Sequence, residues 1–106
     1  MSHDYPKTYS QFKDRYQDIW EAYDRLGATV HGAGPLSAKT RALVKLGISA
    51  SAGQEGAVHS HTRKALSAGA SADEIRQVIL LMLPTLGFPT MMAAMTWVED
   101  VLSPKT

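Results

Sequence analysis

The sequence contains no cysteine. Disulfide bonds, thiolate metal ligands and thiol redox chemistry within the chain are therefore excluded. A strong excess of one charge is also missing, since 11 basic residues face 10 acidic ones and the formal net charge is +1. Neither a basic block nor an interleaving of basic and aromatic residues is present. We therefore expect no nucleic-acid partner.

Long apolar runs are missing as well. The longest one, residues 78–88, is too short to span a bilayer and contains Pro84. The first ten residues, MSHDYPKTYS, lack the apolar segment of a signal peptide. These features predict a soluble, cytoplasmic protein without a membrane partner. At 106 residues the chain is expected to form a single domain over 1–106, with flexible ends at 1–8 and 103–106.

Apolar residues recur at the spacing of helices, and no alternating pattern bounded by turns predicts a strand. We therefore predict an all-α bundle of about five helices. The first begins at Ser10 and ends at Gly27, and a loop over 28–35 follows. The remaining helices are expected at 36–52, 54–69, 71–86 and 89–102, with Ser37 as an N-cap and Pro84 as a kink or end.

The helix that starts after Ser71 has two strong features. Ser71 and Glu74 match a capping box. From Val78 onward the helix is apolar on nearly every side, which is typical of a helix that is buried all round. A domain of this size can hardly cover such a helix alone, so we expect a homo-oligomer.

One helical face converges on a histidine. Gln54, Ala57 and His61 lie at i, i+3 and i+7, and Ala65 extends the same face. On an apolar face an imidazole can exchange a proton near neutral pH, so His61 is the candidate catalytic residue. The alternative is a histidine that only fills the core.

Other polar residues could support His61. Glu55 and His59 lie at i, i+4 on a different face, and His59 points about 200° away from His61. One helix therefore cannot easily offer both histidines to one ion. We expect no metal and no cofactor, and leave open only a metal held across a subunit interface. Arg41 could bind a carboxylate or be solvated or ion-paired, and His31 could line a pocket or be a surface or structural residue.

Three stretches resemble the carboxymuconolactone decarboxylase family, which includes the alkyl hydroperoxidase D-like proteins. They are LSAKTRALVKLGISASAG, HTRKALSAGASADEIRQVI and LGFPTMMAA, within about residues 36–98. The resemblance implies an all-α fold and assembly into trimers or hexamers. It also implies that the histidine of the family's redox site corresponds to His61. The two cysteine positions correspond to Gln54 and Ala57, and the glutamate position to Ala42.

With three of these four residues replaced, the chain cannot act as a cysteine-based peroxidase by itself. It resembles more closely the decarboxylase branch, which lacks the cysteine pair, keeps the histidine and needs no cofactor. Two functions follow from the resemblance. One is a decarboxylase or lyase acting on a small lactone or carboxylic acid, with His61 as acid/base. The alternative is a non-catalytic oligomer that binds a small apolar ligand or a protein partner.

Overall fold

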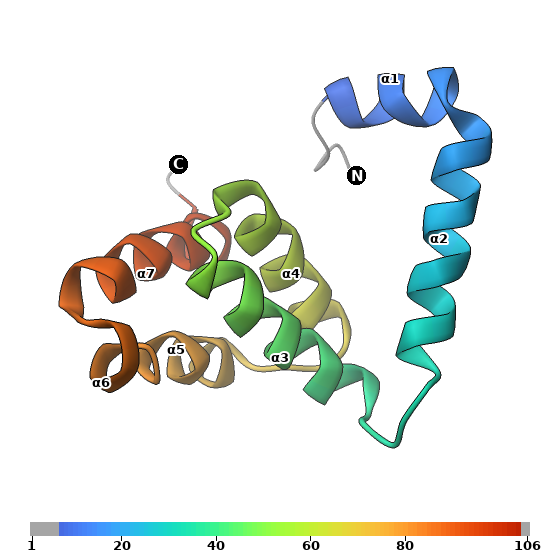
Figure 1. The fold of residues 1–106 in the computed structure, drawn as a ribbon. Coiled ribbons are helices and arrows are strands. Elements are labelled where there is room, and N and C mark those ends of the chain that lie inside the picture. Colours follow the sequence, from blue (N-terminus) through green and yellow to red (C-terminus); the bar gives the residue numbers. More distant parts are fainter. Residues whose placement is uncertain (1–6, 105–106) are drawn as a thin grey trace. The chain divides into compact units, whose positions relative to one another are not determined.

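The computed structural model describes residues 7–104, and every regular element in that part of the chain is a helix. The predicted all-α class is therefore confirmed. The chain divides into two compact units, Met1–Leu36 and Ser37–Thr106. The helices are α1 (Lys7–Arg15), α2 (Gln17–His31), α3 (Ala38–Ser51), α4 (Glu55–Ser67), α5 (Ala72–Leu80), α6 (Leu83–Leu86) and α7 (Phe88–Leu102) (Figure 1).

The segments that we expected to be flexible, residues 1–8 and 103–106, are only partly described by the structure. Residues 1–6 and 105–106 lie outside the described residues. Lys7 and Thr8, which we expected to be flexible, belong to α1. A single domain over 1–106 stays a prediction. Among the described helices, none combines the length and apolar character needed to cross a membrane.

The first unit holds two helices where one was predicted. The backbone leaves helical geometry at Tyr16, with φ −124° and ψ 54°, although no proline or glycine is near. The predicted end at Gly27 is wrong, because α2 continues through this glycine to His31 and takes up the start of the expected loop. A glycine inside a helix costs only about 1 kcal/mol relative to alanine, so it does not force an end.

The apolar stripe of this unit stays at the surface. Neither α1 nor α2 has a buried residue. Trp20 is half-buried, and its Nε1 donates a hydrogen bond to the Tyr9 hydroxyl over 3.2 Å. The ammonium of Lys13 lies 4.4 Å from the centre of the Trp20 ring. The larger apolar side chains of the stripe are exposed: Phe12, Tyr16, Ile19, Tyr23 and Leu26.

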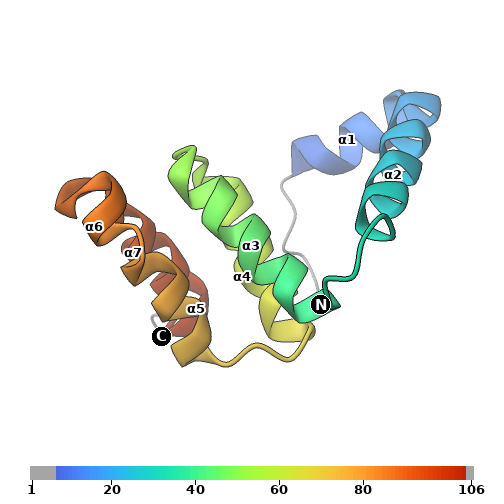
Figure 2. The same ribbon diagram turned by 60° about the horizontal axis from the view of Figure 1, so that its bottom comes forward.

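The second unit is a four-helix bundle in which α3, α4, α7 and α5 follow one another around the core (Figure 2). Each of the four helices packs mainly against its two neighbours in that order. The fully buried core residues come from all four: Leu46, Ala50, Val58, Ala65, Ile75, Ile79, Ala94 and Val98.

The predicted helix starts in this unit are confirmed. The Ser37 hydroxyl accepts a hydrogen bond from the backbone N–H of Thr40 at the start of α3. At the start of α5, Ser71 and Glu74 satisfy each other's backbone N–H groups in a capping box. Side chains thus satisfy backbone donors that the helix itself leaves without acceptors.

The apolar helix after Ser71 is shorter and more exposed than predicted. It ends at Leu80, four residues before Pro84, and the short α6 follows. Leu80 and Leu81 are 50% and 61% exposed, so this helix is not buried on all sides within one chain. This break and the one at Tyr16 give seven helices within residues 7–104, where about five were predicted.

Candidate functional site

The α4 helix carries both histidines of the second unit on a buried support. Gly53, at φ +71°, reverses the chain after α3, a conformation that favours glycine. Three side chains of α4 then face the core: Val58, Thr62 and Ala65. The Thr62 hydroxyl is satisfied by the carbonyl oxygen of Val58 at 2.7 Å. This packed face fixes the rotation of α4, and hence the directions of its other side chains.

His59 lies on the flank of α4 that faces α7. Its Nε2 is 3.0 Å from Oδ2 of Asp100 on α7 and 4.0 Å from Oε2 of Glu55. The His59 side chain is 24% exposed, while both carboxylates are more than half exposed. The predicted i, i+4 pairing of Glu55 and His59 is therefore present, and Asp100 joins it from another helix.

His61 occupies the opposite flank. Residues two apart on a helix are separated by about 200°. Because His59 contacts α7, His61 points to a different side of α4 from the one that carries Asp100. His61 is half-buried, and its Nδ1 is shielded from solvent. The imidazole is thus partly enclosed by protein.

Basic side chains of α3 and α4 lie close enough to one another to interact. Lys64 lies three residues after His61, a spacing that puts both on one face of α4. The pKa of Lys45 on α3 is lowered, first by burial and then by the positive charges of Lys64 and Arg41. Lys64 on α4 therefore lies close enough to Lys45 on α3 to lower the pKa of that lysine. Together, Arg41, Lys45 and Lys64 form what we call the cationic cluster.

The other predicted supporting residues are more scattered. Gln54 is the exposed N-cap residue of α4 and makes no side-chain cap, so it lies just outside the helix in which it was expected. Glu55 is on the first turn, on the His59 flank. His31 is the last residue of α2, in the first unit. Arg41 alone of these belongs to the cationic cluster.

Sequence reasoning missed three charged residues. Lys45 could have been found from its i, i+4 spacing to Arg41, and Lys64 from its i, i+3 spacing to His61. Nothing in the sequence pointed to Asp100, which lies 41 residues after His59. Its contact with His59 exists only because α4 and α7 pack together.

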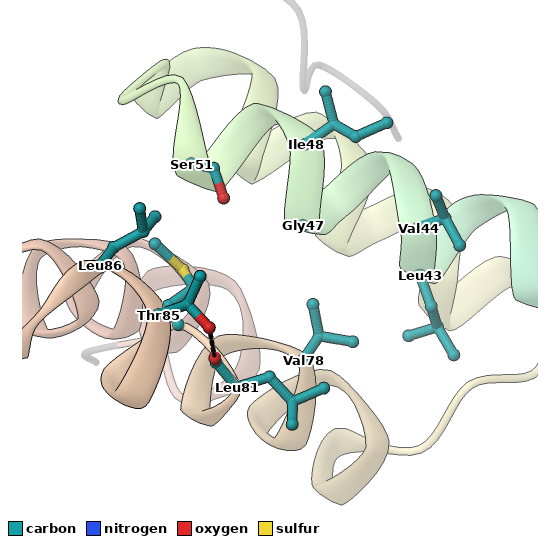
Figure 3. Close-up of a pocket in the computed structure, with 10 residues that line it drawn as sticks. Leu43, Val44, Gly47, Ile48, Ser51, Val78, Leu81, Thr85 and Leu86 are labelled. Carbon is teal, nitrogen blue, oxygen red and sulfur yellow. Dashed lines mark hydrogen bonds between the residues drawn. The ribbon is translucent and has the colours of Figure 1, made fainter.

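A separate apolar groove runs between α3 on one side and α5, α6 and the residues that join them on the other, with a volume of about 610 Å³ (Figure 3). Ser51 and Thr85 contribute its hydroxyl groups, and the Thr85 hydroxyl already donates to the Leu81 carbonyl oxygen. The rest of the lining is apolar: Leu43, Val44, Gly47, Ile48, Val78, Leu81, Met82 and Leu86. Neither His61 nor any charged residue lines the groove.

Comparison with known proteins supports the resemblance noted from the sequence. The sequence model of the carboxymuconolactone decarboxylase family matches residues 17–100. A similar protein is the uncharacterized protein MJ0742 of Methanocaldococcus jannaschii. It is 32% identical over 90 residues, which are 84% of this chain and 86% of that protein.

Proposed function

Because the chain belongs to the carboxymuconolactone decarboxylase family, we propose that it is a cofactor-free decarboxylase or lyase that acts on a small lactone or carboxylic acid. His61 is the general acid/base in this proposal, and the cationic cluster binds the carboxylate. The observation that supports it most is the partly buried position of His61, whose Nδ1 is shielded from solvent, one helical turn before Lys64 of the cationic cluster.

The electrostatics of the cluster favour an anionic ligand. Burial and two like charges all disfavour the charged form of Lys45. A carboxylate bound among Arg41, Lys45 and Lys64 would offset the repulsion between these cations. Arg41 suits this role because its planar guanidinium can hold both carboxylate oxygens at once.

The chemistry assigned to His61 is proton transfer. When the bond between the substrate carbon and its carboxyl group breaks, CO₂ leaves and the electron pair stays on the substrate. Conjugation with the lactone carbonyl spreads that charge, and the nearby cations stabilise it. Protonated His61 then donates a proton to the substrate carbon, which completes the reaction. A partly enclosed imidazole suits this step, because it can be charged or neutral near pH 7.

Turnover of carboxymuconolactone by the purified chain tests the proposal. His61→Ala should lower kcat by about 10²–10⁴-fold, the usual contribution of a positioned acid or base. Lys45→Met should raise KM more than it lowers kcat. Ser60→Ala, a neighbouring change on α4, is the matched control and should keep full activity. Circular dichroism checks that each variant is folded.

Two outcomes would contradict the proposal. One is a lack of turnover with a panel of lactone and carboxylic acids. The other is a His61→Ala variant that stays folded and is as active as the unaltered chain.

The groove supports a second candidate function, the binding of a small apolar ligand without catalysis. Its volume suits a small molecule, and its lining offers few polar groups. In this case a fluorescent apolar probe should bind the chain, and Ile48→Asp should weaken that binding several-fold. His61→Ala should leave probe binding unchanged, because His61 does not line the groove. Probe binding that is insensitive to Ile48→Asp would argue against this function.

A further inference from the structure

Three side chains with metal-binding atoms meet where α4 packs against α7. They are Glu55 and His59 of α4 and Asp100 of α7, and each offers one ligand atom within 4.8 Å of the other two. From this geometry we propose that Glu55, His59 and Asp100 form a binding site for a divalent transition-metal ion such as Zn²⁺. The site lies on the flank of α4 opposite His61, so it is independent of the proposed catalytic function.

The distances leave room for an ion after small side-chain rotations. Zn²⁺ binds nitrogen and carboxylate oxygen at about 2.0–2.2 Å, so two ligands of a tetrahedral ion lie roughly 3.3–3.5 Å apart. The His59 Nε2 is 3.0 Å from the Asp100 oxygen and 4.0 Å from the Glu55 oxygen, one value on each side of that range. Both helices keep their positions, and only exposed carboxylates need to turn.

The fold positions these three metal-binding side chains before an ion binds. Glu55 and His59 are one helical turn apart, so their side chains share a face. Val58, next to His59, and Thr62, three residues after it, are fully buried, and so is Val98, two residues before Asp100. The core therefore fixes the backbones that carry the histidine and the aspartate. Solvent can supply the remaining ligands, because both carboxylates are exposed.

The type of ligand selects the class of metal. One imidazole with two carboxylates suits Zn²⁺, Co²⁺ or Ni²⁺ better than Mg²⁺, which prefers oxygen ligands and retains much of its water. In the metal-free chain, the Nε2 of His59 faces the Asp100 carboxylate at hydrogen-bonding distance. A metal ion on Nε2 takes the place of a proton at that atom, so protons compete with the metal and binding weakens as the pH falls.

Isothermal titration of the untagged full-length chain with Zn²⁺ tests the site. We expect binding of one ion per chain, accompanied by a rise in Tm. His59→Ala and Asp100→Asn should each weaken the affinity by at least about tenfold, which corresponds to the loss of one good ligand contact. Mg²⁺ at millimolar concentration should not compete.

A matched histidine variant separates this site from the proposed active site. His61→Ala changes the same residue type on the same helix, and it should bind Zn²⁺ as tightly as the unaltered chain. His59→Ala could perturb the α4–α7 contact. The Zn²⁺ affinity of Asp100→Asn, a change at an exposed position, therefore provides a second test. The proposal is overturned if Zn²⁺ does not bind, or if both variants bind it with unchanged affinity. It is also overturned if His61→Ala abolishes binding.

Discussion

Arg76 of α5 donates two hydrogen bonds to the carboxylate of Glu99 of α7. Its Nε donates to Oε2 over 2.7 Å, and its Nη2 donates to Oε1 over 3.2 Å. The two residues are 23 positions apart, so this fork joins neighbouring helices of the bundle. Each side chain is about one-third exposed. The pair therefore lies between an ordinary surface ion pair and a buried one.

We predict that Arg76→Met lowers the free energy of unfolding by a small but measurable amount, as expected for an ion pair in contact with solvent. Arg76→Lys should recover only part of the loss, since an ammonium cannot form the two-pronged contact. Urea denaturation measures both. Asp73→Asn serves as the control, because Asp73 is 95% exposed and lies 3.5 Å from Arg76. If Asp73→Asn lowered the free energy of unfolding as much as Arg76→Met, the contact between Arg76 and Glu99 would not be the source of the stabilisation.

The free energy of unfolding should fall in acid, because protonation of Glu99 removes its ion pair with Arg76. The pKa of Glu99 is below its usual value, chiefly because Arg76 donates hydrogen bonds to its carboxylate. A carboxyl with a lowered folded-state pKa stabilises the fold above its unfolded pKa, and this stabilisation is lost as the pH falls through the folded value. Urea titrations between about pH 6 and pH 3 should therefore show a decline that is smaller in Glu99→Gln. An identical decline in both chains would refute the assignment.

The capping box sets the start of α5. Ser71→Ala removes the hydroxyl that accepts from the Glu74 backbone N–H over 3.0 Å. We expect a loss of about 1 kcal/mol in the free energy of unfolding, as is typical for an N-cap serine. Ser67→Ala, at the exposed end of α4, should change it by less than about 0.5 kcal/mol. Thermal or urea unfolding of the two variants gives the comparison, and equal losses would count against the cap.

Two glycines should respond to alanine in opposite directions. Gly47 lies inside α3, and a Cβ there would sit 3.5 Å from Val78 Cγ1, an ordinary contact. Gly47→Ala should therefore raise the free energy of unfolding by about 0.5–1 kcal/mol through helix propensity. Gly87 has φ +98° between α6 and α7, so Gly87→Ala should lower it by about 1 kcal/mol or more. The ordering of the two Tm values is the decisive measurement.

Local sequence signals located helix starts better than helix ends. Ser37 and the Ser71–Glu74 box were predictable because a cap depends only on residues three apart. The break at Tyr16 was not, since neither proline nor glycine marks it. The end of α5 at Leu80 was also missed, because the apolar pattern runs on past it to Leu86.

The same division applies to the candidate site. His61 and its flank follow from the period of one helix, and Arg41 was singled out as a cation for a carboxylate. The pairing of His59 with Glu55 was likewise local. The contribution of Lys45 depends on α3 packing beside α4, and that of Asp100 depends on α7 packing beside α4. The contacts between helices cannot be predicted from the spacing of residues along one helix, although the i, i+4 spacing to Arg41 could have singled out Lys45 itself.

The sequence by itself determined the all-α class, the capped helix starts, the lack of thiol chemistry and the single-helix geometry around His61. These depend on residue type and on spacing within a few turns of one helix. Only the tertiary structure decided that His59 faces Asp100 of α7 and that Lys45 of α3 lies near Lys64 of α4. The reason is that contacts between helices depend on how buried faces such as Val58, Thr62 and Ala65 pack together, and this packing is a property of the whole bundle.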